Sequence, residues 1–178
     1  MLKDQTEPAA AATASATLTD YDHLLSRRES FVKRQYEGKV VIWPHDREMQ
    51  STKQGRLRYY LNTNHHDTCL PEWAIKVQEI PERSGKHRHQ GGVIIFVLDG
   101  EGTTVMDGEP FHWEEGDLVV LPLKPKGVVH QHFNRTPDGT PARWAAYSHN
   151  VVYDYLSAET EQLEMAPTWK AATHGDGE

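Results

Sequence analysis

The segment that decides the fold begins with Gly85-Lys86-His87-Arg88-His89 and ends with His130-Gln131-His132-Phe133-Asn134. Side chains two residues apart on a β-strand point to the same face of the sheet. Each pair of histidines can therefore direct two imidazoles into one cavity. Neutral imidazole is a common ligand of zinc, copper, nickel and iron. The sequence predicts a metal site built by these histidines inside a β-barrel.

Short apolar runs separated by glycine and proline turns surround the two histidine pairs. One of these turns, Asp107-Gly108, is a strong signal for a two-residue hairpin. Many short strands at close spacing are typical of an antiparallel barrel or jelly roll. The predicted strands are residues 40–43, 57–61, 73–80, 86–89, 93–98, 103–106, 111–113, 118–121, 128–133 and 143–148.

The remaining segments predict one domain with tails. Residues 1–18 are alanine-rich, carry little that could form a core, and are expected to be a disordered tail. Residues 19–38 are expected to form a helix on the outside of the barrel, ended by Gly38. The barrel is assigned to residues 39–150, and residues 151–178 to a C-terminal helix and tail. The helical part is predicted from Tyr153 to about Glu164.

Composition excludes several function classes. The 178 residues carry a net charge of -7 with neutral histidines and show no basic stripe, which weighs against nucleic-acid binding. Cys69 is the only cysteine, so an intrachain disulfide and a thiolate metal cluster are excluded. No apolar run approaches the roughly 20 residues that a membrane span needs. The first ten residues lack a secretory signal pattern, and we expect a cytoplasmic protein without a membrane partner.

The central segment resembles the two sequence motifs of the cupin superfamily. The matching residues are His87, His89 and Gly100 in the first motif, and Gly116, Pro122, Pro125, Gly127, His130 and Asn134 in the second, whose latter half is displaced by three residues. This resemblance implies an all-β cupin jelly-roll barrel, a double-stranded β-helix, with an N-terminal and a C-terminal helix. The glutamate that usually follows the first motif is replaced by Val93 or Ile94.

Loss of the glutamate leaves a bound ion with its full charge and up to three open positions if it is octahedral. An anionic chelate and oxygen can share those positions. The pattern resembles the gentisate and salicylate 1,2-dioxygenase group of cupins. That resemblance implies that His87, His89 and His130 are iron ligands and that His132 is a catalytic pocket residue. The arginine that helps those enzymes hold a substrate carboxylate has no counterpart in residues 93–97, so gentisate itself is in doubt.

The leading hypothesis is a mononuclear non-haem iron(II) dioxygenase that uses O2 to cleave a carbon–carbon bond. Its small-molecule substrate would be an aromatic diol, a hydroxy-aromatic acid or a β-dicarbonyl. Zinc, nickel or manganese are the alternative metals. Two other functions stay open: a metal-dependent lyase, isomerase or hydrolase on the same triad, and a non-catalytic small-molecule-binding cupin. A homodimer to which residues 40–61 contribute is expected, because exposed strand edges favour pairing.

Several other polar residues are expected to be structural. Asn134 is predicted to fix the turn after its strand, and Arg88 to form a surface or sheet-edge ion pair. The other histidines are interpreted as surface or sheet residues, namely His65, His66, His112 and His149. Core packing is the preferred interpretation for Tyr60, Trp73 and Trp144, although the three could also form an aromatic wall of a pocket.

Overall fold

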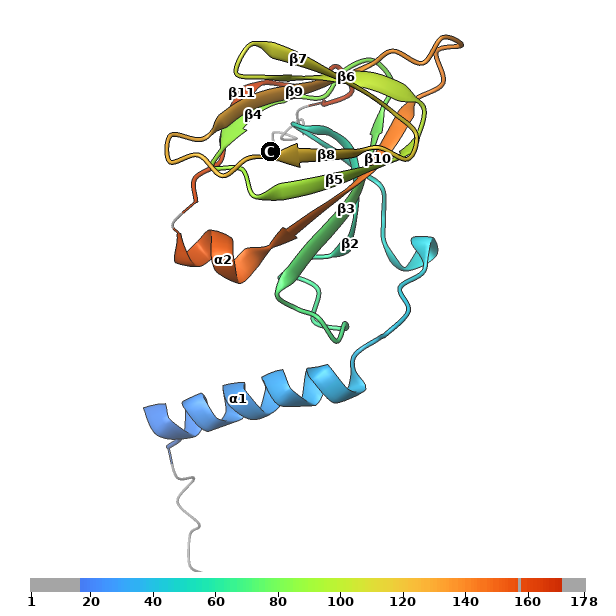
Figure 1. Cartoon of the computed structure of the whole chain (residues 1–178). Helices are drawn as coiled ribbons and strands as arrows, with labels where there is room; N and C mark the ends of the chain where they lie inside the picture. The colour runs from blue at the N-terminus through green and yellow to red at the C-terminus, as the bar shows by residue number, and fades with distance from the viewer. Residues whose placement is uncertain (1–16, 157, 171–178) are drawn as a thin grey trace, which may run out of the picture.

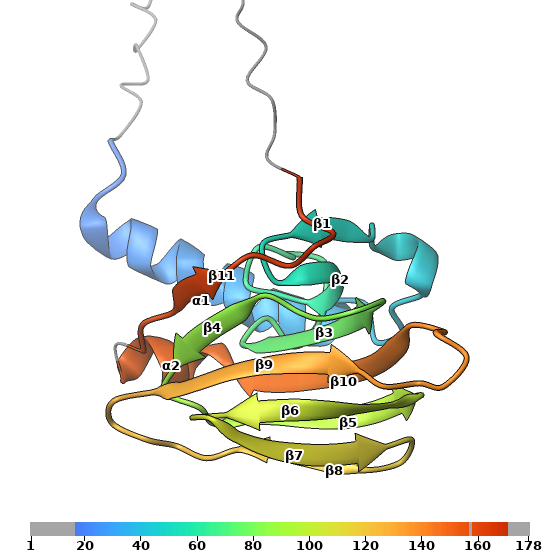
Figure 2. The same cartoon turned by 90° about the horizontal axis from the view of Figure 1, so that it is seen from above.

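The computed structural model describes residues 17–156 and 158–170. Its elements in chain order are α1 (Asp20–Glu37), the short 3-10 helix η1 (Pro44–Asp46), β1 (Gln50–Thr52), β2 (Gly55–Leu61), β3 (Trp73–Ile80), β4 (Lys86–His89), β5 (Val93–Asp99), β6 (Glu101–Met106), β7 (Glu109–Glu114), β8 (Leu118–Leu121), β9 (Val128–Asn134), β10 (Ala142–His149), α2 (Asn150–Tyr155) and β11 (Glu161–Glu164). The strands form two sheets that face each other as a jelly roll (Figures 1 and 2).

The two sheets differ in size and strand order. The six-stranded sheet has the order β1-β2-β3-β10-β5-β8, and the five-stranded sheet the order β11-β4-β9-β6-β7. Neighbouring strands are antiparallel, for example β3 with β10 and β4 with β9. This arrangement confirms the prediction of an all-β jelly-roll barrel with few helices.

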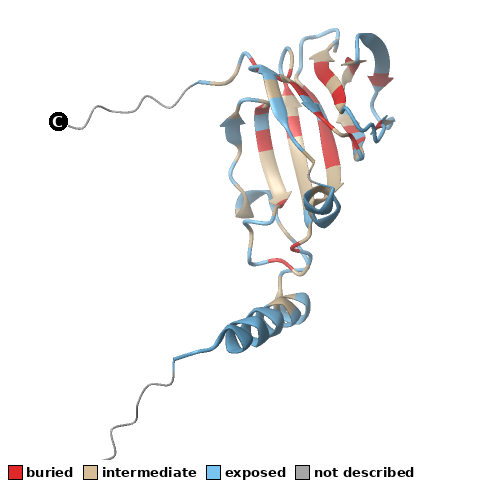
Figure 3. Ribbon diagram, turned by 90° about the vertical axis from the view of Figure 1, so that its left-hand side faces the viewer, coloured by how far each residue is buried: buried red, intermediate tan, exposed pale blue. Residues whose placement is uncertain are grey.

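The apolar core lies between the sheets, and buried positions occur along the strands of both (Figure 3). Its buried members are Ile80, Ile95, Val97, Trp113, Leu121, Val128, Ala142, Trp144 and Ala146. The core is continued by a set of buried polar side chains, among them four histidines of β4 and β9. Buried polar groups need hydrogen-bond partners or a bound ligand, so this end of the barrel is the expected location of a binding site.

The predicted strand over residues 40–43 is wrong. Val40 and Val41 are exposed, and Lys39 makes only an isolated bridge to Thr68. Among the described residues, 40–43 join neither sheet, and the chain turns into η1 at Pro44. Apolar composition alone therefore does not predict a strand here.

The C-terminal helix is shorter than predicted. It ends at Tyr155, and residues 161–164 form β11, which pairs antiparallel with β4. The pairing is supported by an ion pair between Arg88 and Glu161 at 2.5 Å. Because the apolar spacing of the predicted helix is weak, hydrogen bonding to the open edge of β4 determines the structure. The predicted tails lie outside the described residues, except for residues 17–18 and 166–170.

Helix α1 is well capped but buries nothing. The Thr19 side chain accepts a hydrogen bond from the Asp22 backbone, and Asp22 bonds back to the Thr19 backbone at 2.8 Å, which forms a capping box. The helix lies apart from the barrel (Figures 1 and 3), and Leu24 and Leu25 are 52% and 49% exposed. The expectation that it packs on the barrel is wrong. Across the described ranges, no helix combines the length and apolar character needed to cross a membrane.

Candidate metal centre

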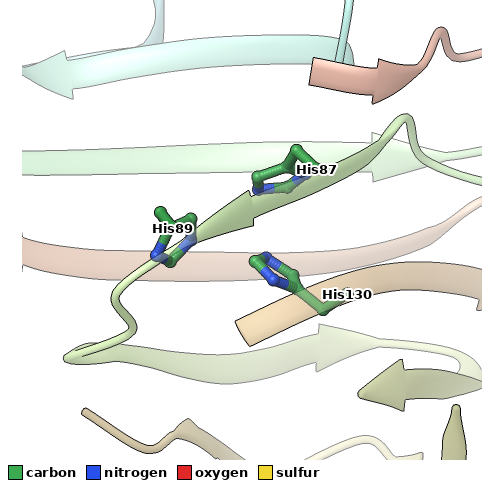
Figure 4. Close-up of side chains that lie close together, drawn as sticks. All are labelled: His87, His89 and His130. Atoms are coloured by element: carbon green, nitrogen blue, oxygen red, sulfur yellow. The ribbon is translucent and has the colours of Figure 1, made fainter. Parts of the chain in front are cut away.

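Three histidines from two adjacent strands converge at one end of the barrel. His87 and His89 lie on β4 and His130 on β9, where His87 is directly opposite His130 in the antiparallel register. The ring centroids of His87 and His130 are 4.1 Å apart, and those of His89 and His130 are 4.7 Å apart. One ligand nitrogen from each ring lies within 4.8 Å of the other two. Figure 4 shows the three rings directed toward one another.

Hydrogen bonds to the main chain set the tautomers of two of these rings. His130 Nδ1 is 3.1 Å from the carbonyl oxygen of Val128, and His87 Nδ1 is 3.4 Å from that of Gly85. A carbonyl only accepts, so each Nδ1 carries the proton and donates it. Each Nε2 then keeps its lone pair, which is the arrangement found when histidine binds a metal through Nε2.

The third ring, His89, has two polar neighbours at Nδ1. The backbone N–H of Gly91 donates to it at 3.0 Å, and the hydroxyl oxygen of Tyr153 lies 3.2 Å away. The Tyr153 hydroxyl donates its proton to the Gly91 carbonyl oxygen. The Tyr153 oxygen is thus able to accept a hydrogen bond from His89. To bind a metal through Nε2, His89 must carry its proton on Nδ1. In that tautomer Nδ1 no longer accepts the hydrogen bond from the Gly91 N–H and instead donates to the Tyr153 hydroxyl oxygen.

The three histidines are neutral at physiological pH. Burial lowers the pKa of His130 to about 4 and that of His89 to about 3. Burial also lowers the pKa of His87, and the adjacent His130 adds to the effect. Only the neutral ring can coordinate a metal. Three converging neutral imidazoles therefore fit a divalent ion of the iron, nickel or zinc type, which prefers such nitrogen donors.

His132 lies one strand step beyond His130 and is held by a different partner. Its Nδ1 is 2.7 Å from the Thr104 hydroxyl, which also accepts the Trp113 indole N–H at 2.9 Å. Thr104 is fully buried, and if it also accepted from His132 its own proton would have no partner. This balance assigns the Thr104 proton to His132 Nδ1. His132 therefore carries its own proton on Nε2 and is a hydrogen-bond donor there.

A cavity of about 260 Å³ is formed beside these histidines. Its lining, among the described residues, is Gln54, Tyr59, Asn62, Ala74, Lys76, His87, His89, Val93, Ile95, Leu121, His130, His132, Trp144, Ala146, Ser148, Asn150, Tyr153 and Thr160. Val93 faces this cavity, whereas Ile94 is 46% exposed on the other face of β5. Of the two residues that could stand at the position of the missing glutamate, Val93 is thus the one that faces the cavity. None of the lining residues is an aspartate or a glutamate.

Residues 76–148, which include all four of these histidines, match the cupin domain family Cupin_2. The chain contains a cupin domain. It is 30% identical over 115 residues to a 5-aminosalicylate 1,2-dioxygenase of a Comamonas species, covering 64% of this chain and 29% of that protein. It is also 30% identical over 70 residues to a gentisate 1,2-dioxygenase of a Haloferax species, covering 39% of this chain and 18% of that protein. The chain thus spans less than a third of the length of these relatives.

The fold of the cupin domain is also similar to that of a solved structure of comparable length. The polyketide cyclase RemF from Streptomyces resistomycificus matches with a TM-score of 0.52 at 13% sequence identity, over 73% of this chain and 89% of that one. At this level of identity the likeness concerns the fold alone. It agrees with the two facing sheets of the cupin domain described above.

A cation that the sequence pattern did not reveal lies in the cavity. Lys76 of β3 reaches the cavity from the six-stranded sheet, and burial lowers the pKa of its ammonium to about 8. Residues 73–80 alternate between apolar and polar side chains, and in the structure Lys76 and Gln78 are on the inner face. The usual expectation places the apolar set inside, so the alternation revealed the strand but not which face it buries.

The remaining polar residues of the cupin domain have structural partners. The Asn134 amide donates to the carbonyl oxygens of Pro81 and Thr140 at 3.0 and 2.9 Å, which confirms that it fixes the turn after β9. Arg88 forms the predicted surface ion pair. Trp144 is buried and lines the cavity, so it belongs to both the core and the pocket wall. His66 and His112 bond to Arg34 and Thr103, away from the cavity.

Proposed function

We propose that this cupin domain is a mononuclear non-haem iron(II) dioxygenase that cleaves a carbon–carbon bond of a chelating substrate. The substrate class is an aromatic diol, a hydroxy-aromatic acid or a β-dicarbonyl. The observation that carries the proposal is the convergence of three neutral imidazoles in a cavity lined, among the described residues, by no carboxylate. In this proposal His87, His89 and His130 hold the iron, and His132 acts on the substrate.

The ligand set explains why a chelating anion is the expected substrate. Three neutral histidines leave the charge of a divalent ion uncompensated, and Val93 leaves the place of a fourth ligand open. When bound, iron(II) would acidify a chelating hydroxyl as a Lewis acid and supply electrons for the reaction with O2. Zinc, nickel and manganese fit the same nitrogen donors, and metal analysis of the purified protein distinguishes them.

The residues around the triad have separate roles in the proposal. His132 donates its Nε2 proton to an oxygen of the substrate, which stabilises negative charge that develops there. Val93, Ile95 and Leu121 form an apolar side of the cavity. An apolar wall limits water near the reacting atoms and so strengthens the electrostatic interactions inside.

The similarity to 5-aminosalicylate and gentisate 1,2-dioxygenases supports this choice of reaction. Those relatives extend well beyond the matched region, so their substrates are not transferred to this chain. The RemF likeness adds no functional argument, because it rests on 13% identity. The proposal therefore names a reaction and a class of substrate.

The test is metal analysis of protein purified without chelators, followed by oxygen-electrode screening with catechols, hydroxybenzoates and diketones. The proposal expects iron and oxygen uptake that depends on one substrate class. Turnover of a compound without oxygen uptake would instead indicate a lyase, isomerase or hydrolase on the same triad. Binding without turnover of any compound would indicate a non-catalytic binding protein.

Two further expectations remain predictions. A homodimer to which residues 40–61 contribute is supported by the exposure of Val40, Val41 and Trp43, which are 83%, 57% and 57% exposed. Light scattering at micromolar concentration tests the dimer, and a monomer contradicts it. Fractionation of cells that express the full chain tests the predicted cytoplasmic location.

A further inference from the structure

Lys76 and the metal-binding histidines face the cavity from opposite walls. The histidines come from β4 and β9 of the five-stranded sheet, whereas Lys76 comes from β3 of the six-stranded sheet. In that sheet Lys76 is opposite Tyr59 of β2 and Ala146 of β10. Because Ala146 is small, the side chain of Lys76 has free space beside it in the cavity.

The ammonium of Lys76 lacks the partner that a charge in such a place needs. Its Nζ donates to Gln54 Oε1 at 3.1 Å and lies 5.9 Å from the centroid of the Tyr59 ring. An ammonium has three N–H donors, so two remain after the bond to Gln54. Over the described ranges Lys76 takes part in no ion pair, in contrast to Lys39, Lys86 and Lys124. A half-buried charge without a counter-ion is costly, and a bound anion would remove that cost.

A second buried donor on the same wall also lacks an acceptor. Trp144 of β10 is 3% exposed and lines the cavity, and its indole Nε1 has no hydrogen-bond partner among the described residues. Native structures seldom leave a buried N–H without a partner, and ligand sites are one of the places where they do. The lining contains no carboxylate that could neutralise Lys76. The wall opposite the histidines therefore offers the positive charge and free N–H groups of Lys76, with the buried Trp144 N–H beside them.

We propose that Lys76 is the binding residue for a carboxylate of the substrate, which makes a single-ring hydroxy-acid the substrate class. The proposal rests on the function proposed above in taking this cavity as the substrate site. It selects one of the three chelating classes, because neutral diols and diketones leave the Lys76 ammonium without a partner. The cavity of about 260 Å³ is smaller than the roughly 300–1,000 Å³ of pockets for drug-sized ligands, so one ring fits better than several.

Calorimetric titration with benzoate and with its neutral isostere benzamide tests this assignment without requiring turnover. The full-length chain is compared with Lys76→Met, which keeps the length of the side chain, and with Lys76→Arg, which keeps its charge. Lys33→Met is the matched control, because Lys33 is exposed on α1 and pairs with Glu37. All four proteins are first freed of metal with a chelator, so that benzoate cannot bind to a metal and a preference for it reports on the protein side chains.

We expect the wild-type chain to bind benzoate about 10- to 100-fold more tightly than benzamide, as for a charge-assisted hydrogen bond. Lys76→Met abolishes this preference, Lys76→Arg retains part of it, and Lys33→Met leaves it unchanged. Equal binding of the two probes by the wild-type chain overturns the proposal, as does a preference that survives in folded Lys76→Met. Circular dichroism verifies folding, and if Lys76→Met does not fold, the comparison of the two probes on the wild-type chain decides.

Oxygen uptake separates this inference from the proposed function. If benzoate binding depends on Lys76 but no compound of the panel drives oxygen uptake, the carboxylate site stands and the dioxygenase proposal fails. If catechol drives oxygen uptake equally in wild-type and Lys76→Met chains and neither prefers benzoate, the dioxygenase stands and the carboxylate site is refuted.

Discussion

The two sheets contribute different chemistry to the same cavity. On the five-stranded sheet each of the four histidines has a hydrogen-bond partner at Nδ1, provided by the main chain or by Thr104. On the six-stranded sheet Lys76 and Trp144 keep N–H groups without partners among the described residues. Satisfied polar groups hold a fixed geometry, which a metal site needs, whereas unsatisfied donors await a ligand. Under the two proposals above, the histidine wall holds the metal and the Lys76 wall binds the substrate carboxylate.

The largest expected effect comes from adding a ligand to the metal-binding side. Val93→Glu places a carboxylate in the cavity, which reduces the effective charge of the ion and occupies an open position. We expect metal binding to be retained or tightened and oxygen uptake to fall below detection. Ile94→Glu is the control, because Ile94 points to the outer face and should leave both properties unchanged. Wild-type kinetics in Val93→Glu would show that residue 93 does not adjoin the metal.

Removing His132 tests whether the five-stranded sheet supplies a catalytic donor in addition to ligands. His132→Ala should retain the metal and reduce turnover by about 100- to 10,000-fold, the range typical for a group that transfers a proton or stabilises an oxyanion. His112→Ala serves as the control, since His112 bonds to Thr103 outside the cavity. Steady-state oxygen uptake measures the effect, and an unchanged rate in His132→Ala contradicts the assigned role.

A smaller effect on turnover is expected from Thr104, which contacts His132 and not the substrate. Thr104→Val removes the hydroxyl that donates to His132 Nδ1, so the ring loses the partner that keeps its proton on Nε2. We expect about a 10-fold loss of turnover with the metal retained. Thr104→Ser keeps the hydroxyl and should restore most of the rate. If Ser and Val variants lose turnover equally, the hydroxyl does not position His132.

The last expected effect concerns the pH dependence of stability, to which the buried histidines contribute. Burial depresses the pKa of His130 to about 4 and that of His89 to about 3, whereas the ordinary value is 6.5. Below pH 6.5 these histidines therefore bind protons in the unfolded chain but stay neutral in the folded chain. The free energy of unfolding falls as the pH is lowered. Each such histidine lowers the free energy of unfolding by about 1.4 kcal/mol for every pH unit between the unfolded and the folded pKa. Denaturant unfolding with a chelator present should show this loss, and His130→Ala should show less of it.

The histidine side of the cavity could be predicted from the sequence, and the Lys76 side could not. His87 and His89 share a face because of the two-residue period of a strand, and that rule holds in any sheet. The same two-residue period correctly predicts that Lys76 lies in a strand. It does not predict which face of that strand points into the barrel. That choice depends on the opposite sheet, where His130 and its neighbours make the interior polar.

Other errors share this origin in long-range contacts. Residues 161–164 pair with β4 because the sheet has a free edge there, which local propensity does not reveal. Helix α1 has a capping box that the sequence displays, but its exposed apolar side chains show that capping does not determine what a helix packs against. Strands and caps are local properties, whereas docking depends on the whole fold.

The most direct test of the central claim is the metal content of three proteins purified side by side: wild type, His130→Ala and His132→Ala. Both residues lie on β9, but only the ring nitrogens of His130 converge with those of His87 and His89, whereas His132 bonds to the Thr104 hydroxyl at 2.7 Å. Elemental analysis should find one divalent ion per chain in the wild type and in His132→Ala, and little in His130→Ala. A metal-free His132→Ala beside a loaded His130→Ala would contradict the proposed ligand set.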